Sequence, residues 1–330
     1  TFLGVVRRLV TFENDQKQRV RVNYADLDVE EFGSVYEGLL EFDPYFTVSA
    51  GHYSFDFKPG SGRSESGSHY TPEELVQPLL KHSLDYLIQD KLKEADPEKG
   101  LLSLTICDVA CGSGHILLSA ARRVGFELAR VRSKEDQPTP SVLRAAIRDV
   151  IRHCIYGVDL NPLAIELCKV ALWLESHNPG EPLSFLDHHI KCGNAIVGLA
   201  HRSELENGIP DEAFKTLPGD EKELAAAFRK RNTAERKERK AKEVQAKVEF
   251  ERQTLSSVEE AIAEHRAFDR MPETTPEEVA LKARAYQKFI GGKGYSFLKA
   301  MADTQVAQFF IPKTTTNKEA LMTDGEYRRI

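Results

Sequence analysis

The chain has 330 residues, which is enough for one large hydrophobic core or two modest ones. Its composition is 41% hydrophobic and 29% charged, as in ordinary globular proteins. Apolar runs such as 116–118 are far shorter than the roughly 20 residues of a membrane-spanning helix. We therefore expect no membrane association and no signal peptide. The net charge of −6 means that a main DNA-binding surface, if there is one, is local or lies elsewhere.

The five cysteines, at positions 107, 111, 154, 168 and 192, are odd in number and lie mostly in apolar segments. This pattern predicts reduced core thiols of a cytoplasmic protein rather than a disulfide framework. Because the first residue is Thr1 and not Met, we expect a fragment of a larger protein, with residues 1–60 as its N-terminal segment. Short apolar stretches and turns alternate there, and one helical piece is expected at 35–41. The small polar residues of 61–70 predict an exposed loop.

A helix is predicted to begin at Thr71-Pro72-Glu73-Glu74 and to run to about Asp90. Thr71 suits the capping position, Pro72 the first helical position, and Glu74 the reciprocal contact of a capping box.

Apolar strand patterns and helical patterns then alternate over the predicted core, 61–200. Strands are expected at 101–107, 155–158 and 190–197, and helices at 116–131, 142–153 and from Pro162 to about Ser176. The segment 127–152 resembles an extra helical insertion between the first two strands. Strands that alternate with helices predict an α/β fold with a parallel sheet covered on both faces.

A glycine loop follows the first of these strands in Thr105-Ile-Cys-Asp-Val-Ala-Cys-Gly-Ser-Gly-His. Gly112 and Gly114 allow a tight turn and the close approach of a ligand. Asp108 stands at the carboxyl end of the strand, where open parallel sheets bind ligands, and it suits a cation. Glycines that serve only packing are the alternative. The Lys-Ser/Thr of a phosphate loop and the third glycine of a dinucleotide fingerprint are absent.

A second acid, Asp159, ends the next strand and precedes Leu160, Asn161 and Pro162. It can accept the two ribose hydroxyls of an adenosyl group, or it can act as part of a helix cap. After the third strand, Gly193-Asn194 can meet an adenine amine or form an ordinary turn. The amino terminus of the helix after Thr71 can receive a carboxylate.

From 201 to 270 the sequence is rich in Lys, Arg and Glu, most densely at 220–251. Val248, Leu255 and Ile262 recur every seven residues, with Val244 and Val258 on the alternate seam. This predicts a charged helical insertion or coiled-coil hairpin that can bind other subunits, with a solvated helix as the alternative. The remaining segment, 271–330, is expected to be helical, with two helices around Gly291-Gly292.

These segments together resemble the adenine-specific amino-methyltransferases of restriction–modification and related phage-defence systems. Gly67-Ser-His-Tyr70-Thr71-Pro72 is similar to the family's motif before the cofactor loop, and Asp108-Val-Ala110-Cys111-Gly112-Ser113-Gly114 to the loop itself, with Val109 where Pro is usual. Ile155-Tyr-Gly-Val-Asp159-Leu160-Asn161-Pro162 is similar to the ribose motif. Gly193-Asn194 stands where many members have Gly-Asp. The resemblance covers about 32–200.

The resemblance implies a Rossmann-like class I methyltransferase: a doubly wound, mostly parallel sheet with an N-terminal helical part and the charged helical insertion. It implies S-adenosylmethionine as cofactor and DNA as partner. The cofactor-binding residues that it implies are Tyr70, Thr71, Pro72, Asp108, Ala110, Cys111, Gly112, Ser113, Gly114, Asp159, Leu160, Asn161, Gly193 and Asn194.

The family's catalytic loop, Asn/Asp-Pro-Pro-aromatic, grips a flipped-out adenine, and no Pro-Pro occurs in this chain. We therefore predict no catalytic residues here, and we expect a fragment that is inactive alone. Two alternatives stay open: a non-catalytic cofactor-binding or assembly subunit, and a methyltransferase that acts on RNA or protein. His188-His189-x-x-Cys192 falls short of a zinc site, and no metal is predicted.

Overall fold

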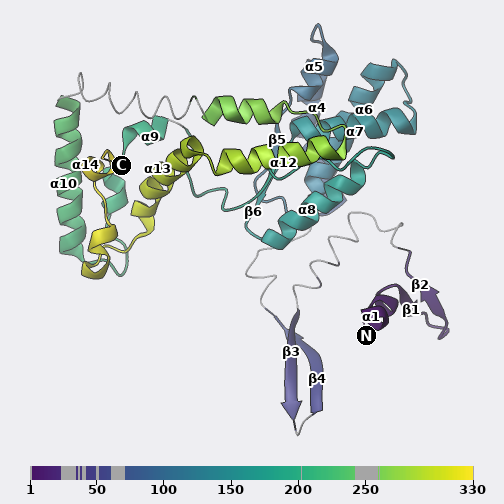
Figure 1. Cartoon of the computed structure of the whole chain (residues 1–330), viewed down its shortest axis with the longest axis horizontal. Helices are drawn as coiled ribbons and strands as arrows, with labels where there is room; N and C mark the ends of the chain where they lie inside the picture. The colour runs from purple at the N-terminus through teal and green to yellow at the C-terminus, as the bar shows by residue number, and fades with distance from the viewer. Residues whose placement is uncertain are drawn as a thin grey trace. The chain divides into compact units, whose positions relative to one another are not determined.

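The computed structural model describes residues 2–23, 35, 38, 42–49, 52–60, 71–201, 203–241, 259 and 261–329 (Figure 1). The chain divides into two compact units. Unit 1 comprises Thr1–Pro179 and His189–Gly193, and unit 2 comprises Gly180–His188 and Asn194–Ile330. The four segments predicted from the sequence have other boundaries and stay predictions.

The first described elements are a helix and two antiparallel hairpins. Helix α1 spans Phe2–Leu9, and strands β1 (Thr11–Glu13) and β2 (Arg19–Arg21) form the first hairpin. Strands β3 (Phe42–Ser49) and β4 (His52–Pro59) form the second. The expected N-terminal helical part thus includes α1, but these residues also form four strands that were not predicted from the sequence. Of the helix expected at 35–41, only Val35 and Gly38 are described, and both are helical.

Alternation of side chains explains the second hairpin. Every second residue of β3 faces every second residue of β4, so that one face carries only Phe, Tyr, Val and Pro and the other carries polar residues and Tyr45. The paired residues of the apolar face are Phe42 with Pro59, Pro44 with Phe57, Phe46 with Phe55, and Val48 with Tyr53.

Helix α4 spans Glu73–Lys91, close to its predicted range, but its start differs from the prediction. Pro72, and not Thr71, is the capping residue, and no side chain caps the helix. The predicted capping box is therefore wrong. The carbonyl of Pro72 accepts the first helical hydrogen bonds, from the N–H groups of Leu75 and Val76. Residues 61–70, including Tyr70, lie outside the described residues.

The strand predicted at 101–107 is mostly wrong, because helix α5 (Pro97–Leu102) takes its first two residues. The side chain of Asp96 accepts the N–H of Lys99 at 3.1 Å, and Pro97 occupies the first turn, where its missing N–H costs nothing. Strand β5 is only Ile106–Asp108.

A three-stranded parallel sheet, in the order β5-β6-β7, forms the centre of unit 1. Strand β6 is Ile155–Asp159 and β7 is Ile190–Cys192, shorter than the predicted 190–197. Asp108 pairs with Gly157, and Asp159 pairs with Cys192. The α/β class and the parallel sheet are confirmed. A doubly wound sheet needs a reversal of strand order, which the described strands do not contain, so that part stays a prediction.

The helices between these strands match their predicted ranges closely. Helix α6 spans His115–Ser133, α7 spans Pro140–Cys154, and α8 spans Pro162–Glu175. Asn161 caps α8 by accepting the N–H of Leu163 at 2.9 Å. Helices α6 and α7 fill the predicted insertion and pack closely, because a Cβ on Gly125 would stand 2.6 Å from a side-chain carbon of Ile147. Cys111, Cys154 and Cys168 are buried as expected, whereas Cys107 and Cys192 are exposed.

Unit 2 is helical in its described residues. Its elements are α9 (Ser203–Asn207), the 3-10 helix η2 (Asp211–Phe214), α10 (Lys222–Ala241), a helix at 261–269, α12 (Pro276–Ile290), α13 (Lys293–Phe310), the 3-10 helix η3 (Thr315–Ala320) and α14 (Asp324–Tyr327). The two helices predicted around Gly291-Gly292 are confirmed. Val244, Val248, Leu255 and Val258 of the predicted heptads lie outside the described residues.

Two apolar clusters hold unit 2 together. The first joins residues that the sequence assigned to two separate segments: Leu205, Ile209, Ala213, Phe214, Phe228, Met301, Leu321 and Tyr327. The second contains Phe185, Phe268 and Tyr286. Beside this second cluster the ammonium of Lys282 is buried against the carboxylate of Glu273 at 2.7 Å. Within the described part of the chain, no helix has the length and apolar character to span a bilayer.

Candidate functional site

The glycine loop between β5 and α6 forms a tight turn at the carboxyl edge of the sheet. Gly112 and Gly114 have φ values of 53° and 93°, which few residues other than glycine adopt. The N–H of Cys111 donates to the carbonyl of Val158 at 3.0 Å, and that of Gly114 to the carbonyl of Cys111 at 2.8 Å. The loop is therefore fixed to β6 as well as to its own strand.

The two glycines serve different purposes. A Cβ on Gly114 would stand 2.7 Å from the sulfur of Cys168 on α8, so this glycine is required by packing. A Cβ on Gly112 would have no described atom within 4 Å. Gly112 thus leaves open space beside the backbone, as the close approach of a ligand requires.

The structure brings Asp108 and Asp159 together at this loop. One carboxylate oxygen of Asp159 accepts the N–H of Gly112 at 2.9 Å, and the other accepts the N–H of Asn161 at 2.8 Å. Asp108 accepts the N–H of Ala110 at 3.0 Å. Both acids predicted from the sequence therefore lie at the ends of paired strands beside this loop, although 51 positions separate them in the chain.

Burial raises the pKa of Asp108, and the negative charge of Asp159 raises it further, while the hydrogen bond from Ala110 lowers it. An acid whose ionised form is disfavoured by partial burial and by a like charge gains from a cationic neighbour. The loop therefore offers an acidic pair that suits a positively charged ligand group.

The edge of the third strand also joins this arrangement. The N–H of Gly193 donates to the carbonyl of Asp159 at 2.9 Å. Asn194 belongs to unit 2, where its side-chain oxygen accepts the N–H of Ile196 at 3.0 Å. The described contacts of Asn194 are those of a turn, and its predicted meeting with adenine stays a prediction.

His115, the first residue of α6, was not singled out from the sequence. One ring nitrogen lies 2.9 Å from the carbonyl of Thr71, and the other lies 2.7 Å from the carboxylate of Glu73. This imidazole ties the start of α4 to the glycine loop, and so brings Thr71 and Pro72 close to the site. The two residues are 44 positions apart in the chain, and no local sequence pattern predicts their contact.

Exposed apolar side chains flank the acids. Leu160 is 63% exposed directly after Asp159, and Val109 is 61% exposed directly after Asp108. Ser113 is half-buried inside the loop. An exposed leucine beside an acid that can bind ribose provides a surface for a flat ring.

The loop fits an adenosyl sulfonium compound by its donor chemistry. An ionised carboxylate has about four acceptor positions, and the two backbone N–H groups use two of those of Asp159, which leaves capacity for hydroxyl donors. Among the described residues only Ala110 donates to Asp108. The loop thus combines open backbone, acceptor capacity and negative charge.

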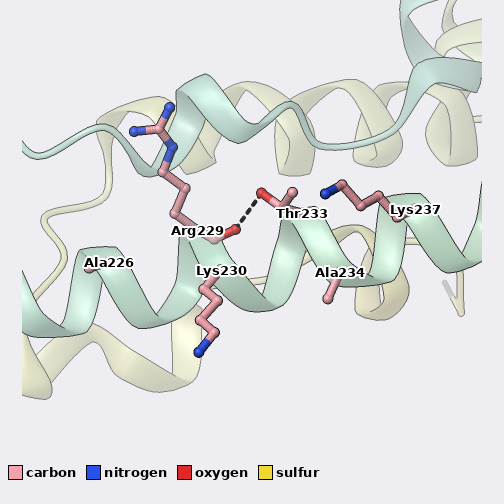
Figure 2. A pocket seen from close by; sticks show the side chains of 6 residues that line it. All are labelled: Ala226, Arg229, Lys230, Thr233, Ala234 and Lys237. Atoms are coloured by element: carbon pink, nitrogen blue, oxygen red, sulfur yellow. Dashed lines mark hydrogen bonds between the residues drawn. The ribbon is translucent and has the colours of Figure 1, made fainter.

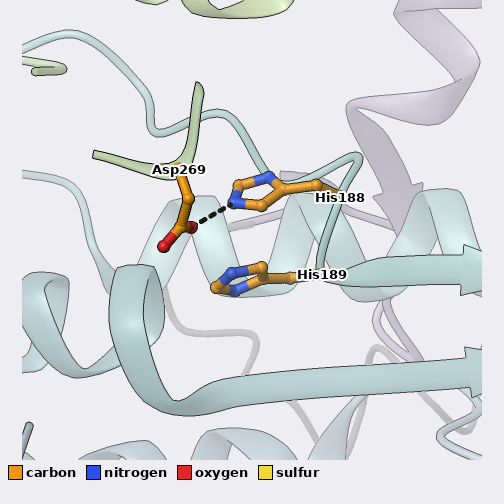
Figure 3. A group of neighbouring side chains, drawn as sticks. All are labelled: His188, His189 and Asp269. Carbon is orange, nitrogen blue, oxygen red and sulfur yellow. Dashed lines mark ion pairs between the residues drawn. The ribbon is translucent and has the colours of Figure 1, made fainter. Parts of the chain in front are cut away.

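The two histidines of the sequence pattern that falls short of a zinc site each pack against an aromatic ring. His188 lies 3.7 Å from Asp269 in unit 2 and stacks on Phe185 with 5.5 Å between ring centres (Figure 3). His189 belongs to unit 1, where it packs on Tyr156 with ring centres 4.1 Å apart. These aromatic contacts give each ring a packing role.

Comparison with known proteins agrees with this geometry. Residues 28–182 match the sequence model of the N-6 DNA Methylase family. A protein of Methanocaldococcus jannaschii named as a type II restriction enzyme and methyltransferase is 24% identical over 181 residues, which cover 42% of this chain and 15% of that protein. The chain thus spans only a small part of the length of this relative. The segment 28–182, which carries the glycine loop and both acids, is therefore similar to the N-6 DNA methylase family.

Proposed function

We propose that this chain is the S-adenosylmethionine-binding part of a DNA adenine methyltransferase of a restriction–modification or related phage-defence system. The observation that carries the proposal is the pair Asp108 and Asp159 at the ends of two paired strands, with Asp159 accepting the N–H of Gly112 in the glycine loop. The family match supports DNA methylation as the reaction class, and the name of the relative supports restriction–modification.

Each residue of the loop has a role that its contacts support. Asp108 would bind the ammonium group of the methionine moiety, because burial and the charge of Asp159 disfavour its ionised form and a cation would offset this. Asp159 would accept the ribose hydroxyls. The backbone of the loop would lie against the ligand, since no described side chain fills the space at Gly112. The residues of this backbone are Ala110, Cys111, Gly112, Ser113 and Gly114.

The surrounding elements would complete the site. Leu160 would cover the adenine ring, and Gly193 with Asn194 would face its amine. The first-turn N–H groups of α4, after Thr71 and Pro72, would meet the methionine carboxylate. His115 would position this helix end, because it holds Thr71 and Glu73.

When bound, S-adenosylmethionine supplies a methyl group on a positively charged sulfur. The residues of this chain bind and orient that group by geometry and charge. Transfer also requires a loop that grips the flipped adenine, and the 330 residues contain no Pro-Pro for it. We therefore propose that the chain alone binds the cofactor and does not transfer the methyl group.

That missing loop favours one alternative, a cofactor-binding or assembly subunit of a defence complex. A transfer assay separates the two when the chain is tested alone and then with a protein segment that carries an Asn-Pro-Pro-aromatic loop. DNA, RNA and protein substrates are compared. Transfer to adenine in DNA only with the added loop supports the proposal. Transfer by the chain alone, or to RNA or protein in preference, contradicts it.

Calorimetry with S-adenosylmethionine and with its demethylated product tests the site itself. Wild type is expected to bind both. Asp108→Ala/Asp159→Ala removes two charge-assisted contacts and is expected to weaken binding by about 100-fold or more. The control Asp90→Ala/Asp136→Ala removes two exposed acids of the same unit and should bind as wild type does. Equal binding by both double variants would contradict the assignment.

A further inference from the structure

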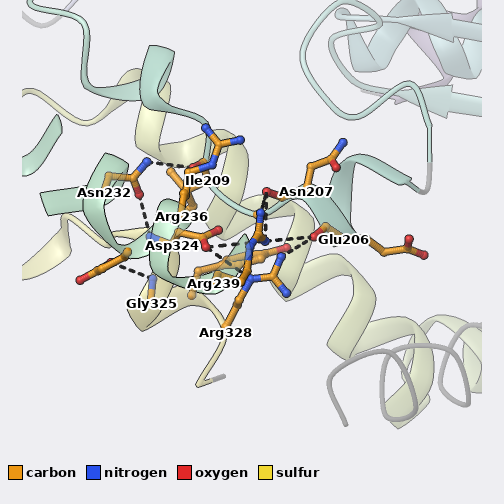
Figure 4. A network of polar contacts seen from close by, with 12 residues as sticks. Glu206, Asn207, Ile209, Asn232, Arg236, Arg239, Asp324, Gly325 and Arg328 are labelled. Atoms are coloured by element: carbon orange, nitrogen blue, oxygen red, sulfur yellow. Dashed lines mark hydrogen bonds and ion pairs between the residues drawn. The ribbon is translucent and has the colours of Figure 1, made fainter. Parts of the chain in front are cut away.

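Helix α10 is held firmly by one of its faces. Ala225, Phe228 and Asn232 are buried in unit 2. The side chain of Asn232 donates to the carbonyl of Ile209 at 3.0 Å and accepts the N–H of Asp324 at 2.7 Å (Figure 4). These contacts fix the rotation of α10, and so they define which side chains point outward.

The ion pairs of α10 lie mainly toward the rest of unit 2. Arg231 pairs with Glu235 and with Glu326, each at 2.8 Å. Arg236 lies 3.8 Å from Asp211, and Arg239 lies 3.6 Å from the buried Asp324. Several cations of this charged sequence are thus neutralised inside the unit.

The outward face differs in its charged residues. Arg229, Lys230 and Lys237 line a shallow depression of about 480 Å³ together with Ala226, Thr233 and Ala234 (Figure 2). Within the described residues, none of these three cations forms an ion pair, and no acid lines the depression. Thr233 donates to the carbonyl of Arg229 at 2.9 Å and adds no charge. The acids Glu223 and Glu238 belong to the same helix but are not among the residues that line the depression.

We propose that this face of α10, defined by Arg229, Lys230 and Lys237, binds the phosphate backbone of duplex DNA. The proposal rests on DNA as the substrate of the proposed function, and it assigns a separate contact surface in unit 2. The solvated-helix alternative from the sequence predicts no DNA binding here, so the test below separates the two. Of the acids interleaved with the basic residues, Glu235 is engaged with Arg231 and with the N–H of Gly325.

The dimensions and charge of the face favour this partner. Seven residues separate Lys230 from Lys237, which is about 10 Å along the helix. Duplex DNA carries one negative charge per about 1.7 Å of axis, so several phosphates face a surface of this length in any register. Ala226 and Ala234 are small and allow the sugar–phosphate chain to come close. The net charge of the whole chain is −6, so that a local basic face is what directs DNA to one place.

The test is fluorescence anisotropy with a labelled DNA duplex several turns long, over about 50 to 200 mM salt. Arg229→Gln/Lys230→Gln/Lys237→Gln is compared with the control Lys288→Gln/Lys293→Gln/Lys299→Gln, which removes three exposed cations from α12 and α13 of the same unit. Gln has a helix propensity close to those of Lys and Arg, so both variants should fold. Circular dichroism checks this.

The α10 variant should lose about tenfold or more in affinity at low salt, and its plot of log affinity against log salt should be shallower by about 0.9 per lost contact. The loss should be equal for duplexes of different sequence, because phosphates carry no sequence information. The control should bind as wild type does.

Equal DNA affinity of wild type and the α10 variant would overturn the proposal, as would an equal loss in the control or no DNA binding by wild type. Tighter binding of an RNA duplex through the same three residues would overturn the choice of partner. Calorimetry of the α10 variant with S-adenosylmethionine should match wild type, so that failure of this surface and failure of the cofactor site are distinguishable.

Discussion

Replacement of Gly114 by alanine should damage unit 1 for two separable reasons. The residue has a φ of 93°, which costs a residue with a Cβ about 1–2 kcal/mol. The new Cβ would also stand 2.7 Å from the sulfur of the buried Cys168, and overpacking of this kind costs about 1–3 kcal/mol. We therefore expect Gly114→Ala to lower the free energy of unfolding by about 2–5 kcal/mol, the sum of both costs.

A double-mutant cycle separates the two costs. Removal of the sulfur in Cys168→Ala leaves 3.5 Å, an ordinary contact, between the new Cβ and that of residue 168. Gly114→Ala/Cys168→Ala should therefore recover the overpacking part, about 1–3 kcal/mol, as a coupling energy. Gly112→Ala is the matched control, because its φ is 53° and its Cβ would meet no described atom, so that only about 1 kcal/mol is expected.

Urea unfolding followed by the fluorescence of Trp173 measures these values. Trp173 is the single tryptophan of the chain and lies in α8 of unit 1, so its signal reports on this unit. If Gly114→Ala were no less stable than Gly112→Ala, or if the coupling energy were close to zero, the close approach of α6 and α8 would be refuted.

Two further changes test the charges. Because burial raises the pKa of Asp108, the protonated carboxyl stabilises the fold below its unfolded pKa, and this contribution is lost as pH rises through the raised pKa. Asp108→Asn should therefore unfold at a higher urea concentration than wild type at neutral pH, and this difference should become smaller in acid. Urea unfolding at several pH values measures the difference. A variant less stable than wild type at neutral pH would contradict the argument. Lys282→Met leaves the carboxylate of Glu273 buried without its cation and should lower the free energy of unfolding by about 3–5 kcal/mol. The double variant Lys282→Met/Glu273→Gln should recover part of this loss. Unfolding followed by circular dichroism measures both variants, and equal stability of the two would contradict the argument.

The core of unit 1 could be predicted where one segment carries all of its signal. The glycines after Asp108 and the Asn161-Pro162 cap identify the starts of α6 and α8 from adjacent residues. Each acid directly follows an apolar strand pattern, so both could be predicted at strand ends. Parallel strands have their carboxyl ends at the same edge of the sheet, which is where the structure has both acids. Sequence was sufficient here because the deciding contacts are local or follow from topology.

The errors arose where two local signals competed. The apolar pair at 101–102 suggested a strand, but Asp96 and Pro97 start a helix that includes it. In β3 and β4 the alternation of aromatic and polar residues is present in the sequence, but no strands were predicted there, and Pro44 and Pro59 are residues that strands rarely contain. His115 could not be found from the sequence, because its contact with Thr71 depends on tertiary structure.

The bonds of Asp159 have a consequence for how the site responds to a ligand. Its side chain holds the glycine loop and the start of α8, and its carbonyl holds the end of β7. A molecule that grips this carboxylate restrains all three segments at once. Amide hydrogen exchange at Gly112, Asn161 and Gly193 should therefore slow together on cofactor binding, as one cooperative patch of protection.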